Sequence, residues 1–260
     1  MKRSQSYVKV RQKNILDYIE SNGIANVMSL SKLFNISPLT VRRDLDELQE
    51  MGKIERYHGG AVAKDKSSKN STLNLKIIAC KHAIAKQAAT MVDDNDTIFV
   101  NSSSTALLVL KYITAKRVTI ITNNAKALFA ARPNDSVLFF TGGEIRTPKD
   151  AMVGEFAVNS ISSVTANKCF MGCAGVSPTK GVMSTVLQEA SVNQLMYKQT
   201  YGQRILLADY RRFDCIHPFK ACSIDEITHI IYDTNVAAKT VEPYKKLGIN
   251  IIQAKSNTKI

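Results

Sequence analysis

A hydroxyl group and two adjacent guanidinium groups stand close together in the stretch 37–45, S-P-L-T-V-R-R-D-L. If this stretch is helical, Thr40 and Arg43 lie on the face away from Val41, Leu45 and Leu48. An arginine can present its fork to guanine O6 and N7 or bridge two phosphates, and a threonine can contact a phosphate or a thymine methyl group. The stretch is therefore typical of a helix that contacts DNA. The alternative is a solvated helix face on which Arg43 pairs with Glu47 one turn later.

Hydroxyl, amide and charged residues also follow three apolar runs further along the chain. They occupy 101–105, N-S-S-S-T, then 122–124, T-N-N, and 209–212, D-Y-R-R. Each apolar run is expected to be a strand, and helical patterns follow the first two. Backbone N–H groups and hydroxyls at such a position, together with an arginine, can bind an anion such as phosphate. The alternative for 102–105 is a plain helix cap.

Apolar spacing and turn residues indicate the elements that would position the first group. Ile15 and Ile19 repeat at helical spacing, and Ser29 is able to cap a second, short helix. Asn35 tolerates the left-handed backbone of a tight turn, after which Ser37 is expected to cap a third helix. A strand that runs into a glycine turn follows. The expected elements are helices over 10–24, 29–34 and 38–51 and a strand over 53–61, which is the order of a winged helix-turn-helix domain.

The later part of the chain alternates short apolar runs with helical patterns. This alternation predicts an α/β domain with a largely parallel sheet, in which ligands bind at the carboxyl ends of the strands. Strands are expected at 97–100, 118–122, 137–141, 169–173, 205–208 and 227–232, with helices at 81–91, 105–113, 125–131, 187–200 and 241–247.

The 260 residues carry a formal charge of +13, from 35 basic and 22 acidic side chains. Such a surplus favours polyanionic partners, of which nucleic acid is the simplest. Hydrophobic residues make up 45% of the chain, which excludes a wholly disordered protein. No apolar run approaches the ~18 residues of a membrane helix, so no membrane partner is expected. The five cysteines form no C-x-x-C pair and lie near no histidine cluster, so we expect no disulfide framework, metal or cofactor, and a cytoplasmic location.

Three motifs near the N-terminus identify a family. They are R-x-x-x-I-x-x-x-I from Arg11, S-L-S-x-L-F-N-I-S-x-x-T-V-R-R-D-L over 29–45, and G-K-I-x-R-x-H-G-G-A over 52–61. Together they closely resemble the DNA-binding domain of the DeoR family of bacterial transcriptional regulators. The resemblance implies that 38–51 is the recognition helix and that the stretch H-G-G forms the wing. The candidate DNA-binding residues are Ser37, Thr40, Arg42, Arg43, Lys53, Arg56, His58 and Gly59.

The second domain continues this resemblance. In the family it looks like the ribose-5-phosphate isomerase and CoA-transferase type of α/β fold, used as a sugar-phosphate sensor. The loop 101–105 departs from the usual D-S-G-T-T, since Asn101 replaces the aspartate and Ser103 the glycine. A missing glycine makes the close approach of phosphate harder, although asparagine and serine still donate hydrogen bonds. Arg212 keeps the charge of the family's usual lysine, whereas Asn167 replaces another aspartate, so the sugar end is expected to be altered. The candidate effector-binding residues are Asn101, Ser102, Ser103, Ser104, Thr105, Thr122, Asn123, Asn124, Lys180, Glu189, Asp209 and Arg212.

The sequence therefore predicts a winged helix-turn-helix domain over 1–62, a polar linker over 63–75 and an α/β effector-binding domain over 76–260. The resemblance implies a repressor of sugar-metabolism genes whose binding to double-stranded operator DNA is modulated by a phosphorylated sugar. A homo-oligomer, dimer or tetramer, is expected, because two-fold proteins meet repeated half-sites.

The alternative function is a sugar-phosphate isomerase-like enzyme with an appended DNA-binding domain. Such an enzyme needs a base beside the substrate carbon, and Glu189 matches the carboxylate that isomerase relatives use, although it also reads as an ordinary acidic residue of a first helical turn. Lys180 lies near the place of their catalytic lysine. However, two positions at which those isomerases carry aspartates fall on Asn167 and Ser177, which cannot ionise as carboxylates. We therefore expect no catalytic residues; a basic scaffold without a ligand is a third possibility.

Overall fold

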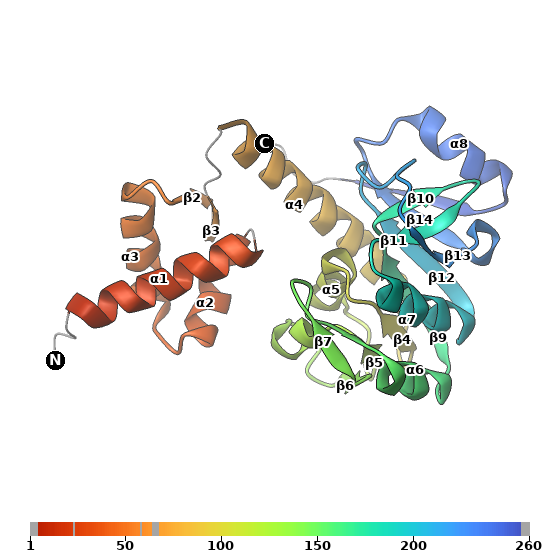
Figure 1. Ribbon diagram of the computed structural model, residues 1–260, viewed down its shortest axis with the longest axis horizontal. Coiled ribbons are helices and arrows are strands. Elements are labelled where there is room, and N and C mark those ends of the chain that lie inside the picture. The colour runs from red at the N-terminus through yellow and green to blue at the C-terminus, as the bar shows by residue number, and fades with distance from the viewer. Residues whose placement is uncertain (1–4, 23, 58, 64–67, 256–260) are drawn as a thin grey trace. The chain divides into compact units, whose positions relative to one another are not determined.

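The computed structural model describes residues 5–22, 24–57, 59–63 and 68–255 (Figure 1). The chain divides into two compact units, Met1–Ile77 and Ile78–Ile260. The point of division lies within the long helix α4 (Ser68–Ala89). Each unit has its own hydrophobic core, and each is described by itself.

In the described residues of the N-terminal unit, helices α1 to α3 pack with a small antiparallel sheet of order β1-β3-β2. The core is formed by apolar side chains at helical spacing, of which Ile15, Ile19, Leu30 and Leu45 are fully buried. The predicted winged helix-turn-helix order is confirmed. The elements are α1 (Gln5–Asn22), β1 (Ile24–Asn26), α2 (Val27–Leu33), α3 (Pro38–Glu50), β2 (Ile54–Tyr57) and β3 (Gly60–Ala63).

Side-chain caps set the starts of the two helices in the helix-turn-helix. Ser37 Oγ accepts a hydrogen bond from Thr40 N at 3.1 Å, so the expected cap of α3 is confirmed. Asn35 has a φ of 49°, the left-handed conformation expected of this turn. The expected cap of α2 is wrong, because Asn26 Oδ1 accepts from Ser29 N at 2.7 Å and Ser29 therefore lies inside the first turn. The strand β1 ends at this cap residue, and its three residues are too few to show a strand pattern in the sequence.

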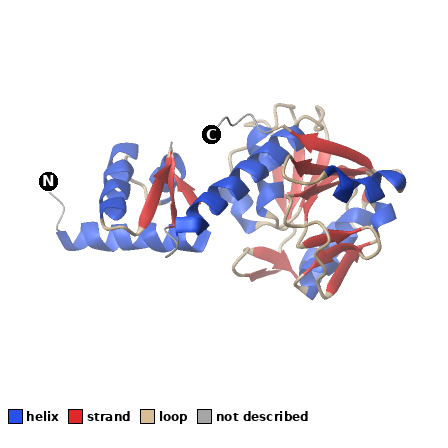
Figure 2. Ribbon diagram, turned by 90° about the horizontal axis from the view of Figure 1, so that it is seen from above, coloured by secondary structure: helices blue, strands red, loops and turns tan. Residues whose placement is uncertain are grey.

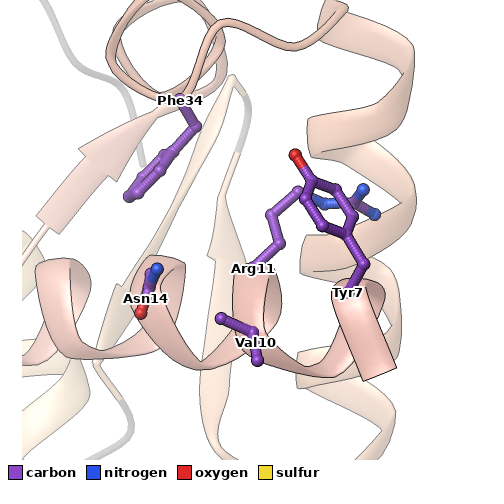
Figure 3. A pocket seen from close by; sticks show the side chains of 5 residues that line it. All are labelled: Tyr7, Val10, Arg11, Asn14 and Phe34. Carbon is purple, nitrogen blue, oxygen red and sulfur yellow. The ribbon is translucent and has the colours of Figure 1, made fainter. Parts of the chain in front are cut away.

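A buried ion pair joins α1 to α3. Arg11 donates from Nε and Nη2 to the two carboxylate oxygens of Asp44 at 2.6 and 2.7 Å. Asp44 is only 2% exposed and also accepts from Gln12 Nε2 at 3.3 Å. Figure 3 shows the Arg11 side chain in a small pocket on α1, beside the ring of Tyr7. The bidentate geometry fixes the orientation of α3 against α1.

Within its described residues, the C-terminal unit is built around a seven-stranded sheet of order β15-β14-β12-β9-β4-β5-β6. Neighbouring strands are parallel throughout, so the predicted parallel α/β architecture is confirmed. All carboxyl ends of the strands therefore meet at one edge of the sheet. The strands are β4 (Thr97–Val100), β5 (Thr119–Thr122), β6 (Val137–Phe140), β9 (Ala166–Gly172), β12 (Thr200–Ala208), β14 (His229–Asp233) and β15 (Asn250–Ala254).

Helices cover both faces of this sheet (Figure 2). Neighbouring strand residues point to opposite faces, so Phe99 packs in the core beneath α6, α7 and α8, whereas Ile98 packs in the core beneath α4 and α5. The helices are α5 (Ser104–Val109), α6 (Glu155–Ser162), α7 (Leu187–Lys198) and α8 (Ala238–Lys246), with the 3₁₀ turns η1 (Leu110–Tyr112), η2 (Ala125–Phe129) and η3 (Ile224–Glu226). Short antiparallel strands complete the unit: β7 (Glu144–Arg146), β8 (Ala151–Val153), β10 (Gly175–Ser177), β11 (Gly181–Ser184) and β13 (Phe219–Cys222).

The segment expected to be a linker, 63–75, overlaps regular structure, because α4 begins at Ser68. Its polar composition gave no apolar period, yet no proline or glycine interrupts the helix between 68 and 89. The domain boundaries at 62 and 76 stay a proposal. No helix in the described ranges is both long enough and apolar enough to cross a membrane.

We expect Asp44→Ala to destabilise the N-terminal unit by about 2–3 kcal/mol. The substitution leaves the Arg11 guanidinium, whose side chain is 12% exposed, without the carboxylate that compensates its loss of water. Hydrogen–deuterium exchange of the full chain would show faster exchange in α1 and α3 with α7 unchanged. Asp17→Ala removes an exposed carboxylate of α1 and is the matched control. Equal protection in the two variants would contradict the role given to the ion pair.

Candidate nucleic-acid interface and anion site

The outward face of α3 carries the arginines expected to contact DNA. Arg42 and Arg43 are exposed, while the opposite, apolar face of the helix is buried in the core. Thr40 is half-buried, and its hydroxyl lies 2.9 Å from Ser37 Oγ. Ser37 and Thr40 therefore hold the first turn of the helix, and the two guanidinium groups extend from its exposed side.

Glu47 has a partner other than Arg43. Its Oε2 accepts a hydrogen bond from Gln12 Nε2 at 2.5 Å. The ion pair that would neutralise Arg43 on a solvated helix face is absent from the described part of the chain. The Arg43 guanidinium thus keeps its charge and its fork for a partner outside this unit.

The wing is the β2–β3 hairpin, and Arg56 fastens it to α3. The Arg56 guanidinium donates to Arg42 O and Gly60 O, both at 3.2 Å, and forms an ion pair with Asp46. Gln49 Oε1 accepts from Arg56 N at 3.1 Å. Arg56 is thereby a brace between the wing and α3, in addition to being a candidate for phosphate contact.

The other wing residues are differently placed. Lys53 is exposed in the turn before β2. Gly59 turns the hairpin with a φ of 97°, which glycine adopts without strain. The candidate contact residue His58 lies outside the described residues.

Asn101 closes the carboxyl edge of the sheet between β4 and β9. It is 2% exposed, and its Nδ2 donates to Gly172 O at 2.9 Å and to Asn193 Oδ1 at 3.2 Å. Its Oδ1 accepts from Gly172 N at 3.1 Å and from Ser103 N at 3.2 Å. An aspartate could not make the first two bonds, because a carboxylate has no N–H group. The asparagine therefore serves the fold, and its amide is fully engaged within the protein.

Ser103 packs against Gly172 on the neighbouring strand. A Cβ atom at Gly172 would lie 1.9 Å from Ser103 Oγ, so the glycine makes room for the serine side chain. Ser103 Oγ also accepts from Thr105 N at 3.2 Å at the start of α5. The glycine missing from the loop is thus compensated by a glycine in β9.

The polar residues at the end of β5 mostly hold the loop in place. Thr122 Oγ1 donates to a β4 carbonyl at 2.6 Å and accepts from Asn124 N at 3.1 Å, and the Asn124 side chain caps η2. Asn123 Nδ2 donates to Met152 O at 3.1 Å. The buried Asn123 Oδ1 has no hydrogen-bond donor among the described residues. It is therefore an acceptor that a ligand hydroxyl could satisfy.

Cationic side chains gather beyond the ends of β4 and β12. Arg211 Nη2 lies 2.7 Å from Asp209 Oδ2, and Arg212 Nε lies 3.8 Å from the same atom. Lys81 of α4 donates to Ser104 Oγ at 2.9 Å. Burial lowers the pKa of Lys81, and the charges of Arg211 and Arg212 lower it further. Asp209 compensates only part of this charge, so the group favours an anion.

A second polar group lies at the start of α7. Glu189 is 5% exposed, and its Oε2 accepts from Lys149 Nζ at 2.6 Å and lies 3.5 Å from Ser102 Oγ. Lys149 belongs to the turn between β7 and β8, so this hairpin is held against the helix. The carboxylate that an isomerase would use as its base is here paired with a lysine.

Two other residues singled out in the sequence lie away from these groups. Lys180 lies in the exposed turn between β10 and β11, and no hydrogen bond or ion pair within the described ranges joins it to Asn101, Glu189 or Asp209. Asn167 lies near the amino end of β9, where its Oδ1 accepts from Thr97 N at 2.8 Å. Asn167 thus stands at the end of β9 opposite to Gly172, and the altered sugar end stays a prediction.

Sequence reasoning missed Lys81, Lys149 and Arg211. Lys81 and Ser104 are 23 positions apart and Lys149 and Glu189 are 40 apart, so no local spacing reports either contact. Arg211 carried a signal, since it stands in the D-Y-R-R motif, yet only the structure shows that it is the main partner of Asp209.

Two family models match the chain. Residues 11–67 match the DeoR-like helix-turn-helix domain, and residues 77–234 match the DeoR C terminal sensor domain. The chain is 29% identical over 246 residues to the HTH-type transcriptional regulator GolR of Listeria innocua, which covers 93% of this chain and 96% of that protein. It is also 29% identical over 244 residues to the lactose phosphotransferase system repressor of Staphylococcus aureus, with 90% and 96% covered.

Two solved structures match part of the chain at lower similarity. eIF2B delta from Chaetomium thermophilum matches with a TM-score of 0.41 and 15% identity, covering 62% of this chain and 58% of that chain. Ribose 5-phosphate isomerase from Plasmodium falciparum matches with a TM-score of 0.36 and 16% identity, covering 51% of each chain. The chain thus spans little more than half the length of these structures.

We expect Asp209→Asn to remove a pH-dependent part of the stability of the C-terminal unit. Burial alone would raise the pKa of Asp209, but the hydrogen bond and charge of Arg211 outweigh it and lower the pKa below its ordinary 3.8. The contribution is therefore present above pH 3.8 and is lost as the pH falls through the lowered value.

The variant should be less stable than the parent near neutral pH, and the difference in unfolding free energy should shrink as the solution is acidified. Urea titrations at a series of pH values would measure it. Asp225→Asn changes an exposed aspartate and is the matched control. A difference that stays constant with pH would contradict the assignment.

Proposed function

Because the chain belongs to the DeoR family of transcriptional regulators, we propose that it represses genes of sugar metabolism. In this proposal the N-terminal unit binds double-stranded operator DNA through α3 and its wing. The C-terminal unit binds a phosphorylated sugar, and that binding modulates the affinity for the operator. Similarity to a repressor named for a lactose phosphotransferase system supports the link to sugar metabolism.

The observation that carries the DNA-binding proposal is the positioned arginine pair of α3. Arg42 and Arg43 are exposed side by side, on a helix whose start is capped by Ser37 and whose orientation is fixed by the ion pair of Asp44. A pre-positioned guanidinium loses less conformational entropy on binding, and its fork matches guanine or phosphate. The exposed Lys53 would add a phosphate contact from the wing.

The proposed effector site is the carboxyl edge of the parallel sheet. Lys81, Arg212 and the Ser104 hydroxyl would bind the phosphate, because these groups supply positive charge and a hydrogen bond in one place. Asn123 Oδ1 and the Glu189 carboxylate would accept hydrogen bonds from sugar hydroxyls. The positions from Asn101 to Ser103 hold this edge rather than the ligand.

We also propose that the protein acts in the cytoplasm as a homo-oligomer, either a dimer or a tetramer. A single recognition helix covers only a few base pairs, whereas a two-fold arrangement reads two half-sites. The reduced state of five cysteines agrees with this location.

We expect Arg43→Ala to reduce the affinity for a specific operator by about 1–3 kcal/mol. The side chain is exposed, so the fold should be unaffected. Arg43→Lys keeps the charge without the fork, and it should retain salt-dependent binding while losing sequence discrimination. Anisotropy titrations of the full chain would measure the specific affinity with a duplex selected from a random library and the sequence-independent affinity with a scrambled duplex. Unchanged specific affinity in Arg43→Ala, with the exposed-lysine variant Lys198→Ala as control, would rule out the recognition role of α3.

We expect Arg212→Ala to leave operator binding nearly normal. The affinity for the effector should fall by about 10- to 100-fold, because a charge-assisted hydrogen bond to the phosphate is lost. A thermal-shift screen of phosphorylated hexoses and pentoses against their unphosphorylated forms would find the ligand, because a ligand of the native state raises the melting temperature. The Lys198→Ala variant again serves as control. Equal stabilisation by the unphosphorylated sugars would refute the phosphate assignment.

A further inference from the structure

Leu39 lies in the first turn of α3, on the side of the helix that faces away from the core, and it is 57% exposed. At 3.6 residues per turn, the buried side of the helix points almost directly away from Leu39. Arg42 and Arg43 follow at i+3 and i+4, so they are its neighbours on the exposed side. The buried residues of α3 are Val41, Asp44, Leu45 and Leu48. An apolar side chain thus lies between the arginines proposed to meet DNA and the start of the helix.

The backbone that carries Leu39 is held firmly. It is the second residue of α3, enclosed by the cap in which Ser37 Oγ accepts from Thr40 N at 3.1 Å. Leu39 lies outside the apolar core of the unit. The Leu39 side chain therefore contributes little to the stability of the fold. Its position is nevertheless fixed, because the helix that carries it is capped by Ser37 and packed against the core.

We propose that Leu39 contacts the 5-methyl group of a thymine in the major groove and so specifies a T·A pair at that position. This inference rests on the proposed function of the N-terminal unit as a reader of operator DNA. The first residues of a recognition helix are those that meet base edges. The thymine methyl is the apolar group that the major groove presents, and leucine, which has no hydrogen-bonding group, can discriminate bases only by such a contact.

The charges around Leu39 favour the same partner. Arg42 and Arg43 attract the phosphate backbone, and their forks also match guanine, but neither side chain ends in an apolar group that would select a thymine methyl. Thr40 also carries a methyl group that could meet a thymine. However, Thr40 is half-buried and its hydroxyl lies 2.9 Å from Ser37 Oγ, whereas Leu39 extends freely from the surface.

Replacement of thymine by deoxyuridine tests the proposal, because it removes only the methyl group. The full chain would first select its preferred duplex from a random library, and each thymine of that duplex would then be replaced in turn. Loss of one buried methyl contact should weaken binding about fourfold, at one position in each half-site. Leu39→Ala should bind the unmodified duplex about fourfold less tightly and should be insensitive to the same replacement.

Two further variants serve as controls. Met51 is equally exposed, at 57%, but lies at the other end of α3, about 18 Å along the helix axis. Met51→Ala should therefore keep the deoxyuridine effect. Thr40→Ser, which removes the competing methyl and keeps the hydroxyl, should keep it as well.

The outcomes separate this inference from the proposed function. A selected duplex in which no thymine methyl matters, or in which Leu39→Ala keeps the full deoxyuridine effect, would overturn the role of Leu39 and leave DNA binding intact. If the deoxyuridine effect is lost in Thr40→Ser and kept in Leu39→Ala, the thymine contact belongs to Thr40 and the role proposed for Leu39 is overturned. Failure to select any duplex sequence would overturn both the inference and the proposed reading of operator DNA.

Discussion

The parallel direction of the strands in the seven-stranded sheet is the constraint on which the C-terminal unit depends. It brings the ends of β4, β9 and β12 to one edge, where backbone pairing stops and polar groups need other partners. Asn101 supplies those partners between β4 and β9, since its amide donates twice and accepts twice. At the same edge, the hydrogen bonds of Asn101 hold the backbone in place, and the exposed hydroxyl of Ser104 and the cations around it lie beside that fixed backbone.

In the N-terminal unit, too, the residues that position the surface differ from those that are exposed on it. Arg11 and Asp44 orient α3, and Arg56 braces the wing against it through Asp46. Arg11 and Asp44 are paired with each other in the interior, whereas Arg56 both braces the wing and stays a candidate for phosphate contact. Arg42, Arg43 and Leu39 are left on the outside of the same helix. A reading surface built in this way can change its contact residues without loss of the fold.

The sequence predicted elements whose signals are local and missed those defined by distant partners. The cap at Ser37, the turn at Asn35 and the strands with buried apolar runs follow from neighbouring residues, and the structure confirms them. Strands β1, β7 and β8 have three residues each, too few to show a period, and β1 forms because the distant strand β3 pairs with it. The site divides similarly, because the motif residues were predicted whereas Lys81 and Lys149 contact partners far along the chain.

A regulator differs from an enzyme in what it requires of such an edge. Catalysis needs a free base, whereas a switch needs a ligand that interacts more favourably with one state than with another. Under the proposed function, a phosphorylated sugar would take over Lys81 from Ser104 and compete with Lys149 for Glu189. Replacing these contacts would release the β7–β8 hairpin and alter the surroundings of α4, the helix within which the two units divide. The ion pair with Lys149 makes Glu189 unsuitable as the base of an isomerase. Under the proposed function, the same ion pair is the contact that a ligand would break to change the conformation.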